Sequence, residues 1–243
     1  ERITLVTIDE KSLAEVGPWP WPRQELARLV NAIDEAGAQL QIHDVFLAEP
    51  KDGDAGLVAA LESSRGAVLA QVPILQSEQT ARVGAMSHAL TAVSCSAQPP
   101  GASSGISLPS TQNYIASHAG FSAISKGHIT PIVASDGSIR QFPALICVDG
   151  MPYPALAISA LLEATNSVDW NASVRADTSF FGPEFRLQLD AYPGLNIPLD
   201  SQGNIRISYK QAPDNFRAVS ASDVMLGNIE PGLFENTWVL VGA

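Results

Sequence analysis

Apolar residues in the first third of the chain alternate between strand-like and helix-like patterns. Residues 3–8 form a short, β-branched and almost continuous apolar run, which is typical of a strand buried on both faces of a sheet. Two further strands are expected over 41–46 and 67–74, and a helix is expected over 54–64. Apolar residues at helical spacing predict another helix before the second strand: Leu26, Leu29, Val30 and Ile33. This order of elements predicts parallel strands joined by right-handed crossovers.

The second half of the chain has the pattern of antiparallel hairpins. Asp136-Gly137 lies between the apolar runs 129–133 and 139–142, and this arrangement predicts a tight hairpin turn. A second hairpin is expected over 195–209, and residues 155–164, apolar on nearly all sides, predict a buried helix. We therefore expect an α/β fold: a mixed sheet with an N-terminal parallel β-α-β-α-β unit, later antiparallel hairpins, and helices packed on the sheet.

Composition suggests how the chain is organised. Residues 83–125 contain no charged side chain other than histidine and are rich in Ser, Ala, Gly and Pro, so we expect an irregular loop or insertion there. We expect a single domain over 1–243, with a parallel half at about 1–82 and a hairpin-rich half at 126–243. Because the chain begins with glutamate rather than methionine and ends on a predicted strand at 237–241, we expect it to be truncated at both ends.

Charge narrows the classes of partner. Lys and Arg total 14 against 25 Asp and Glu, which gives a net charge of −11, and no basic stripe is present. Nucleic-acid binding and attraction to an anionic membrane surface are therefore not expected. Hydrophobic residues make up 46% of the chain, enough for a sizeable core, but no uncharged apolar stretch approaches the ~20 residues needed to span a bilayer.

The residue types that usually carry catalysis are sparse. The sequence has no Gly-x-Ser-x-Gly, no phosphate-binding Gly-rich loop and no His-Glu-x-x-His motif, and its four histidines lie far apart, so we expect no catalysis, no cofactor and no metal. His43 is interpreted as a core histidine. Cys95 and Cys147 can form a disulfide in an oxidising compartment or remain two unpaired, buried thiols, and the second interpretation is favoured.

A candidate ligand site follows from the expected sheet, because open α/β sheets bind ligands beyond the carboxyl ends of their strands. If the first two strands are neighbours, Asp9 approaches Asp44 and Glu49 at one edge, and the proline-rich loop 17–23 folds over them. That loop supplies apolar walls and one cation, a usual combination in a small-molecule pocket. The candidate ligand-binding residues are Asp9, Trp19, Trp21, Arg23, Asp44, Phe46 and Glu49.

A purely structural role is the commoner explanation for residues of these types. Asp9 is well placed to cap the helix that follows the first strand. Trp19 and Trp21 can seal the core, and Arg23 can pair with a carboxylate. Both interpretations stay open at the level of the sequence.

Several short motifs, in order along the chain, together resemble a known family. They include Ile8-Asp9-Glu10-Lys11-Ser12-Leu13, Gly17-Pro18-Trp19-Pro20-Trp21-Pro22-Arg23, Asp44-Val45-Phe46, Asp136-Gly137-Ser138-Ile139-Arg140 and Trp238-Val239-Leu240-Val241-Gly242-Ala243. The ordered set is similar to the CHASE-type sensory domains of the second class, and the similarity covers nearly the full chain. The sequence departs from the family pattern at His43, where a small apolar residue is expected, and at its end, where such domains usually run on.

The resemblance implies a location and a role. Such domains are extracytoplasmic, here periplasmic, and are inserted after an N-terminal membrane helix. Further membrane helices and a cytoplasmic histidine kinase, nucleotide cyclase, diguanylate cyclase or Ser/Thr kinase follow. The resemblance carries over no ligand-binding residue.

We therefore expect a non-catalytic input domain that senses an unknown small-molecule or peptide ligand. Binding would bias a two-state receptor homodimer by population shift, and membrane contact would occur only through flanking helices. The main alternative is an extracytoplasmic protein-interaction or assembly module without a small ligand, with 83–125 as its contact surface. A hydrolase or transferase is the least favoured hypothesis, since such an enzyme needs a nucleophile within hydrogen-bond reach of a base.

Overall fold

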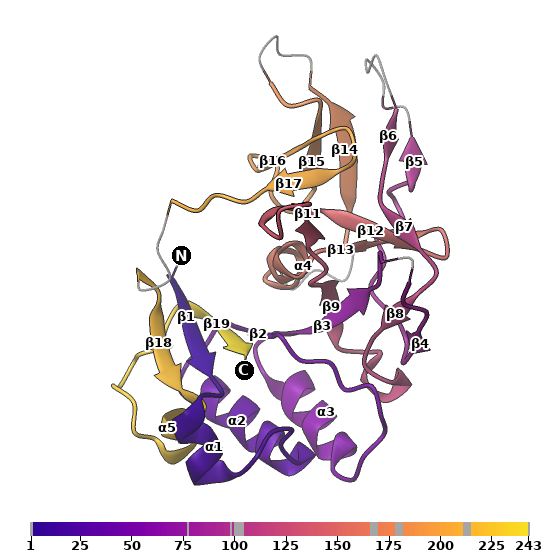
Figure 1. Cartoon of the computed structure of the whole chain (residues 1–243). Helices are drawn as coiled ribbons and strands as arrows, with labels where there is room; N and C mark the ends of the chain where they lie inside the picture. The colour runs from indigo at the N-terminus through magenta and orange to yellow at the C-terminus, as the bar shows by residue number, and fades with distance from the viewer. Residues whose placement is uncertain are drawn as a thin grey trace.

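A computed structural model describes residues 2–76, 78–97, 99, 105–165, 170–177, 182–210 and 215–242. Within this part a mixed sheet of eight strands runs through the lower half of the molecule in the order β18-β1-β19-β2-β3-β8-β4, with β9 also paired to β3 (Figure 1). Among these described strands the one antiparallel pairing is that of β3 with β8, and β4 is parallel to β8. The strands are β1 (Arg2–Thr7), β2 (Leu40–His43), β3 (Ala67–Pro73), β4 (Arg82–Val83), β8 (Tyr114–Ile115), β9 (Ser125–His128), β18 (Arg217–Ser220) and β19 (Thr237–Gly242).

Helices cover the two faces of this sheet unequally. One face packs against α1 (Glu10–Val16), α2 (Arg23–Glu35), α3 (Asp54–Ser63) and α5 (Ala221–Leu226), whose apolar residues share a core with β1 and β19 (Figure 1). The other face carries α4 (Leu156–Glu163), which lies over β2, β3 and β9. The expectation of a buried helix there is confirmed, since Ile158 and Leu162 face a second core while Ala160 faces the sheet.

The second core lies between α4 and several small antiparallel or mixed sheets, drawn in the upper part of Figure 1. The ladders are β10-β11-β17, β13-β12-β7, β14-β15-β16 and β5-β6. Their strands are β5 (Ser96–Ala97), β6 (Ile106–Ser107), β7 (Ser110–Thr111), β10 (Ile132–Val133), β11 (Ile139–Pro143), β12 (Leu145–Val148), β13 (Met151–Pro154), β14 (Ala172–Ala176), β15 (Phe185–Leu189), β16 (Asn196–Leu199) and β17 (Asn204–Arg206). The expected α/β class with a mixed sheet and hairpins is confirmed.

The first of the two expected hairpins forms as predicted, with β10 antiparallel to β11, and the second differs from the expectation in the partners of both strands. In the second, the turn at 200–203 closes, but β16 pairs with β15 and β17 pairs with β11. The physical reason is β15, an unpredicted strand whose alternate residues Phe185, Leu187 and Leu189 are buried and which offers β16 a full ladder.

The assumption that the first two strands are neighbours is wrong. The C-terminal strand β19 lies between them, parallel to β1 on one side and to β2 on the other. Its side chains Val239 and Val241 are fully buried against the helices, while Leu240 packs toward the opposite face. A strand that is apolar on both faces is stable in the centre of a sheet rather than at its edge.

The low-charge segment 83–125 is mostly irregular where it is described, with strands of only two residues and a 3₁₀ turn at Ala119–Phe121. It is attached to the second core by a disulfide between Cys95 and Cys147, whose Cα atoms are 6.0 Å apart. The favoured expectation of two unpaired thiols is therefore wrong. Residues 52 positions apart in sequence meet here because Cys147 lies on β12, next to the strand β7 that this segment supplies.

Replacing Gly127 by alanine is expected to destabilise the domain by about 2–3 kcal/mol, because β9 and α4 are in close contact there. A Cβ atom at this position would lie 2.5 Å from the Cα atom of Leu156 and 2.5 Å from Oγ of Ser159. The measurement is the urea unfolding midpoint. Gly56→Ala in α3 is the matched control: its Cβ would meet nothing within 4 Å, so this variant should be as stable as the parent or up to about 1 kcal/mol more stable.

Candidate functional site

A cleft of about 390 Å³ opens beyond the carboxyl end of β2. Its walls come from two segments: the proline-rich loop together with the first turn of α2, and the chain from residue 44 to residue 51 that follows β2. The cleft brings together every candidate residue from the sequence except one: Trp19, Trp21, Arg23, Asp44, Phe46 and Glu49. The cavity lies beyond the carboxyl end of β2, which is where open α/β sheets bind ligands, and that these residues bind a ligand remains a prediction.

The two tryptophans of the loop have different roles. Trp21 is only 2% exposed, and its indole N–H donates a hydrogen bond of 2.8 Å to the carbonyl of Gly17. The ring of Trp19 packs edge-to-face on it at 5.9 Å and keeps 36% of its surface exposed. Trp21 thus belongs to the core, as the structural interpretation expected, and its hydrogen bond holds the loop in place, whereas Trp19 presents its ring in the wall of the cleft.

Arg23 lines the cleft, but its guanidinium group is already paired with other groups of the protein. Its Nε atom donates to Oδ1 of Asp54 at 2.6 Å, and Nη2 donates to the carbonyl of Glu49 at 3.0 Å. His118 completes the group: Gly120 N–H donates to its Nδ1, so Nε2 carries the proton and donates to Oδ2 of Asp54 at 2.8 Å. Burial acts to raise the pKa of Asp54, but its hydrogen bonds from Lys51 N–H, Arg23 and His118 outweigh burial and lower it.

The carboxylates of Asp44 and Glu49 are different, because neither forms a side-chain hydrogen bond or ion pair with any residue in the described part of the chain. Asp44 is held by its backbone, whose N–H donates to the carbonyl of Val241 at 2.8 Å. Desolvation by the surrounding protein raises the pKa of its side chain. The ammonium of Lys51 also lines the cleft. These three groups are the charges that a ligand would find.

Asp9 does not line the cleft and has a structural role. Its carboxylate accepts hydrogen bonds from the backbone N–H and the hydroxyl of Ser12 at 2.9 and 2.8 Å, and from the hydroxyl of Ser220. Burial acts to raise the pKa of Asp9, but these bonds lower it overall. Because β19 separates β1 from β2, the expected approach of Asp9 to Asp44 does not occur.

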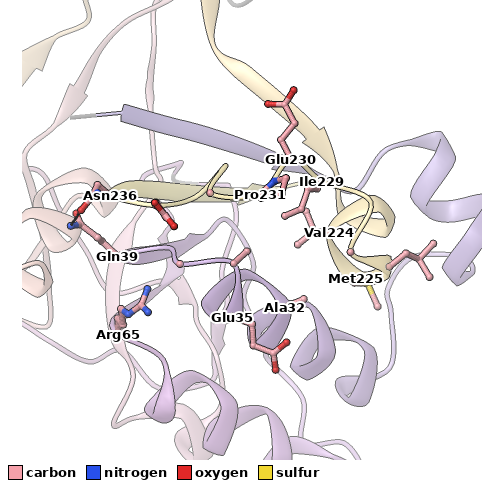
Figure 2. Close-up of a pocket in the computed structure, with 16 residues that line it drawn as sticks. Ala32, Glu35, Gln39, Arg65, Val224, Met225, Ile229, Glu230, Pro231 and Asn236 are labelled. Atoms are coloured by element: carbon pink, nitrogen blue, oxygen red, sulfur yellow. Dashed lines mark hydrogen bonds between the residues drawn. The ribbon is translucent and has the colours of Figure 1, made fainter.

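A larger cavity of about 980 Å³ lies at the opposite, amino-terminal edge of the sheet (Figure 2). Sequence reasoning missed it because it is built from the ends of α2 and α5 and from loop residues 227–236, which carry turn signals only. Figure 2 shows Glu35, Arg65 and Glu230 at separate places around this cavity rather than facing one another. Glu230 pairs with Arg217, and Arg65 donates to the carbonyl of Ala38. The smaller cleft is therefore the better candidate.

A model of the CHASE2 domain matches residues 1–243, the whole chain. The chain belongs to the CHASE2 family. CHASE2 domains are extracytoplasmic, non-catalytic sensory domains of signal-transduction receptors, so the expected role of this chain as a sensing domain is confirmed at that level. Neither the curated proteins nor the solved structures compared with this CHASE2 domain give a significant match. In the described residues, no helix has both the length and the apolar character needed to cross a bilayer.

Proposed function

We propose that this CHASE2 domain senses a small ligand in the cleft beside Asp44, as the periplasmic input domain of a bacterial membrane receptor. The cytoplasmic output would be a histidine kinase, a nucleotide cyclase or a diguanylate cyclase. The observation that carries the proposal is the combination of exposed aromatic rings and unpartnered carboxylates around one cavity. Trp19 is 36% exposed and Phe46 is 41% exposed, and both line the cleft with Asp44.

Such a combination is costly in a free protein and favourable in a complex. Two large rings lose contact with water when a ligand covers them, and polar groups at the same site then fix the ligand's orientation. The cavity of about 390 Å³ is within the range of small-molecule sites, roughly 300–1,000 Å³.

Hydrogen bonds from the cleft supply a route for the signal. Asp44 N–H donates to Val241 in the central strand β19, so a ligand that moves the wall would act on this strand. On the other side, Leu47 N–H donates to the hydroxyl of Ser117, and His118 N–H donates to the carbonyl of Leu47. A ligand that binds one arrangement of these segments better would shift a receptor homodimer toward it.

A thermal-shift screen of the domain against metabolites, peptides and metal ions tests the proposal. A ligand present at 100 times its dissociation constant should stabilise the folded domain by roughly 2.7 kcal/mol. The shift should be lost in the Trp19→Ala, Phe46→Ala double variant and kept in Phe216→Ala, which removes an exposed ring outside the cleft. A shift that survives the double variant, or a screen without any saturable hit, would contradict a small-ligand site in the cleft.

The alternative, an assembly module that uses 83–125 as its contact surface, gains no support from the described part of that segment. Its large apolar side chains are mostly buried in the two cores rather than exposed: Leu90, Ile106, Leu108 and Phe121. Val83 is its one large apolar residue among the exposed ones in the described chain. A segment that packs its apolar residues inward offers little surface for a partner.

A further inference from the structure

We propose that the ligand of the cleft is an organic cation, whose ammonium group is held by the carboxylate of Asp44 against the rings of Trp19 and Phe46. The inference rests on the proposed function and adds to it the chemical class of the ligand. It follows from which charges in the cleft are already paired and which are free.

The free charge in the cleft is predominantly negative. Four charged side chains line it: Arg23, Asp44, Glu49 and Lys51. Arg23 gives its Nε and Nη2 donors to Asp54 and to the carbonyl of Glu49, and is only 5% exposed, so it is poorly available to an anion. Two carboxylates and one ammonium remain, which favours a ligand of positive charge.

Asp44 lines the cleft together with the two exposed rings, and it lies two residues from Phe46 on the same segment, so it is the carboxylate that we assign to the cation. The side chain of Asp44 has no hydrogen bond or ion pair to any described residue and is exposed to solvent, while partial desolvation by the surrounding protein raises its pKa. An ammonium group beside it supplies the missing donor and compensates the lost hydration. A neutral apolar ligand would instead bury the carboxylate further without a partner, which is unfavourable.

The aromatic rings complement the same charge. The faces of indole and phenyl rings attract cations, indole most strongly. Trp19 and Phe46 reach the cleft from two different segments, before α2 and after β2, and both keep a large exposed fraction. Trp21 supports Trp19 from behind and does not need to touch the ligand. Aromatic walls combined with a free carboxylate are the usual chemistry of amine recognition.

A cationic group can belong to a free amine or to a lysine side chain of a peptide, and the probes separate these sources. Benzylamine and tetramethylammonium represent small cations, and Gly-Lys-Gly represents the peptide. Benzyl alcohol and benzoate have the shape of benzylamine with neutral and negative groups. Chemical-shift titrations of the domain with each probe should give the tightest binding among the cations, with benzoate the weakest of the matched aromatic probes.

Variants of the cleft make the test specific. Asp44→Asn should weaken binding of the cations roughly three- to tenfold, and Lys51→Met should tighten it roughly twofold, because it removes a repelling charge. Glu35→Gln is the matched control, since it removes one negative charge at the opposite edge of the sheet, where Glu35 lines the larger cavity. It should leave the dissociation constants unchanged. Circular dichroism checks that the variants fold, which is expected because the Asp44 side chain makes no hydrogen bond in the described chain.

The outcomes separate this inference from the proposed function. If benzoate or benzyl alcohol binds more tightly than benzylamine and loses affinity in Phe46→Ala, the cleft is a ligand site but the cation assignment is wrong. Cation binding that is equal in the parent and in Asp44→Asn also overturns the assignment. If the cations fail and the wider screen yields only neutral or anionic ligands, the assignment fails too. If nothing binds in either experiment, the proposed function itself fails.

Discussion

Acidification from pH 7.5 to pH 4 should strongly destabilise this CHASE2 domain, because three histidines are neutral in the folded protein and protonation favours the unfolded chain. Burial lowers the pKa of His43 and of His88 from 6.5 to about 4, and lowers the pKa of His128 to about 3. Nearby Lys126 adds to the effect at His88. The unfolded chain, with histidine pKa values near 6.5, binds these protons more readily.

The sign and window of the effect follow from linkage. Above about pH 6.5 each histidine is neutral in both states, and the stability of the domain is at its full value. As the pH falls below 6.5 the unfolded chain binds protons first, so this stability is lost until the pH reaches the lowered pKa values of 3 to 4. A shift of one pKa unit corresponds to ~1.4 kcal/mol, so His43 and His128 together account for several kcal/mol. That loss is a large fraction of the total stability of a domain, which is about 5–15 kcal/mol. The measurement is the urea midpoint between pH 7.5 and pH 4.

His128→Leu isolates one contribution. Both ring nitrogens of His128 are buried without a hydrogen-bond partner in the described structure, so an apolar side chain of similar size should fold in its place. The variant should lose less stability between pH 7.5 and pH 4 than the parent does. Each protein at pH 7.5 serves as its own reference, since His128 is neutral there in both states. Equal losses in the two proteins would show that protonation of His128 does not drive acid unfolding.

Much of the sheet was predictable because several of its strands are continuous apolar runs in the sequence. Residues 3–8, 67–74 and 237–241 predicted β1, β3 and β19 within a residue or two. Which strands become neighbours was not predictable in this way. An apolar run indicates that a strand is buried on both faces, but which strand becomes its neighbour depends on the packing of the whole molecule. The insertion of β19 between β1 and β2 is the consequence, and it removed Asp9 from the candidate site.

The strand β9 shows a different limit. Its sequence, Ser-Lys-Gly-His, has no apolar alternation, yet all four residues are buried beside β3. It is buried because Gly127 allows α4 to approach closely, a property of tertiary contact that periodicity does not record. The cleft was nevertheless predicted at the right edge of the sheet, because the carboxyl-end rule requires only that the direction of a strand is known. Loop 17–23 precedes α2 and loop 44–49 follows β2, and residues of both loops line the cleft.

Breaking the disulfide between Cys95 and Cys147 is expected to cost roughly 4 kcal/mol of unfolding free energy. The bond closes a loop of about 52 residues, and cross-linking a loop of that length removes a large part of the conformational freedom of the unfolded chain. An extracytoplasmic domain forms such bonds in an oxidising compartment. The bond also holds the low-charge segment against β12, whose Leu145 and Cys147 belong to the second core.

The Cys95→Ser, Cys147→Ser double variant provides the measurement. Its urea midpoint without reductant should match that of the parent with reductant, and both should lie well below the midpoint of the oxidised parent. Reductant should leave the double variant unchanged. An oxidised parent whose midpoint does not move on reduction would contradict a stabilising bond. The cleft is built from residues between 19 and 51, and none of these belongs to the second core that the disulfide joins. A ligand that binds in the cleft should therefore still raise the melting temperature of the double variant.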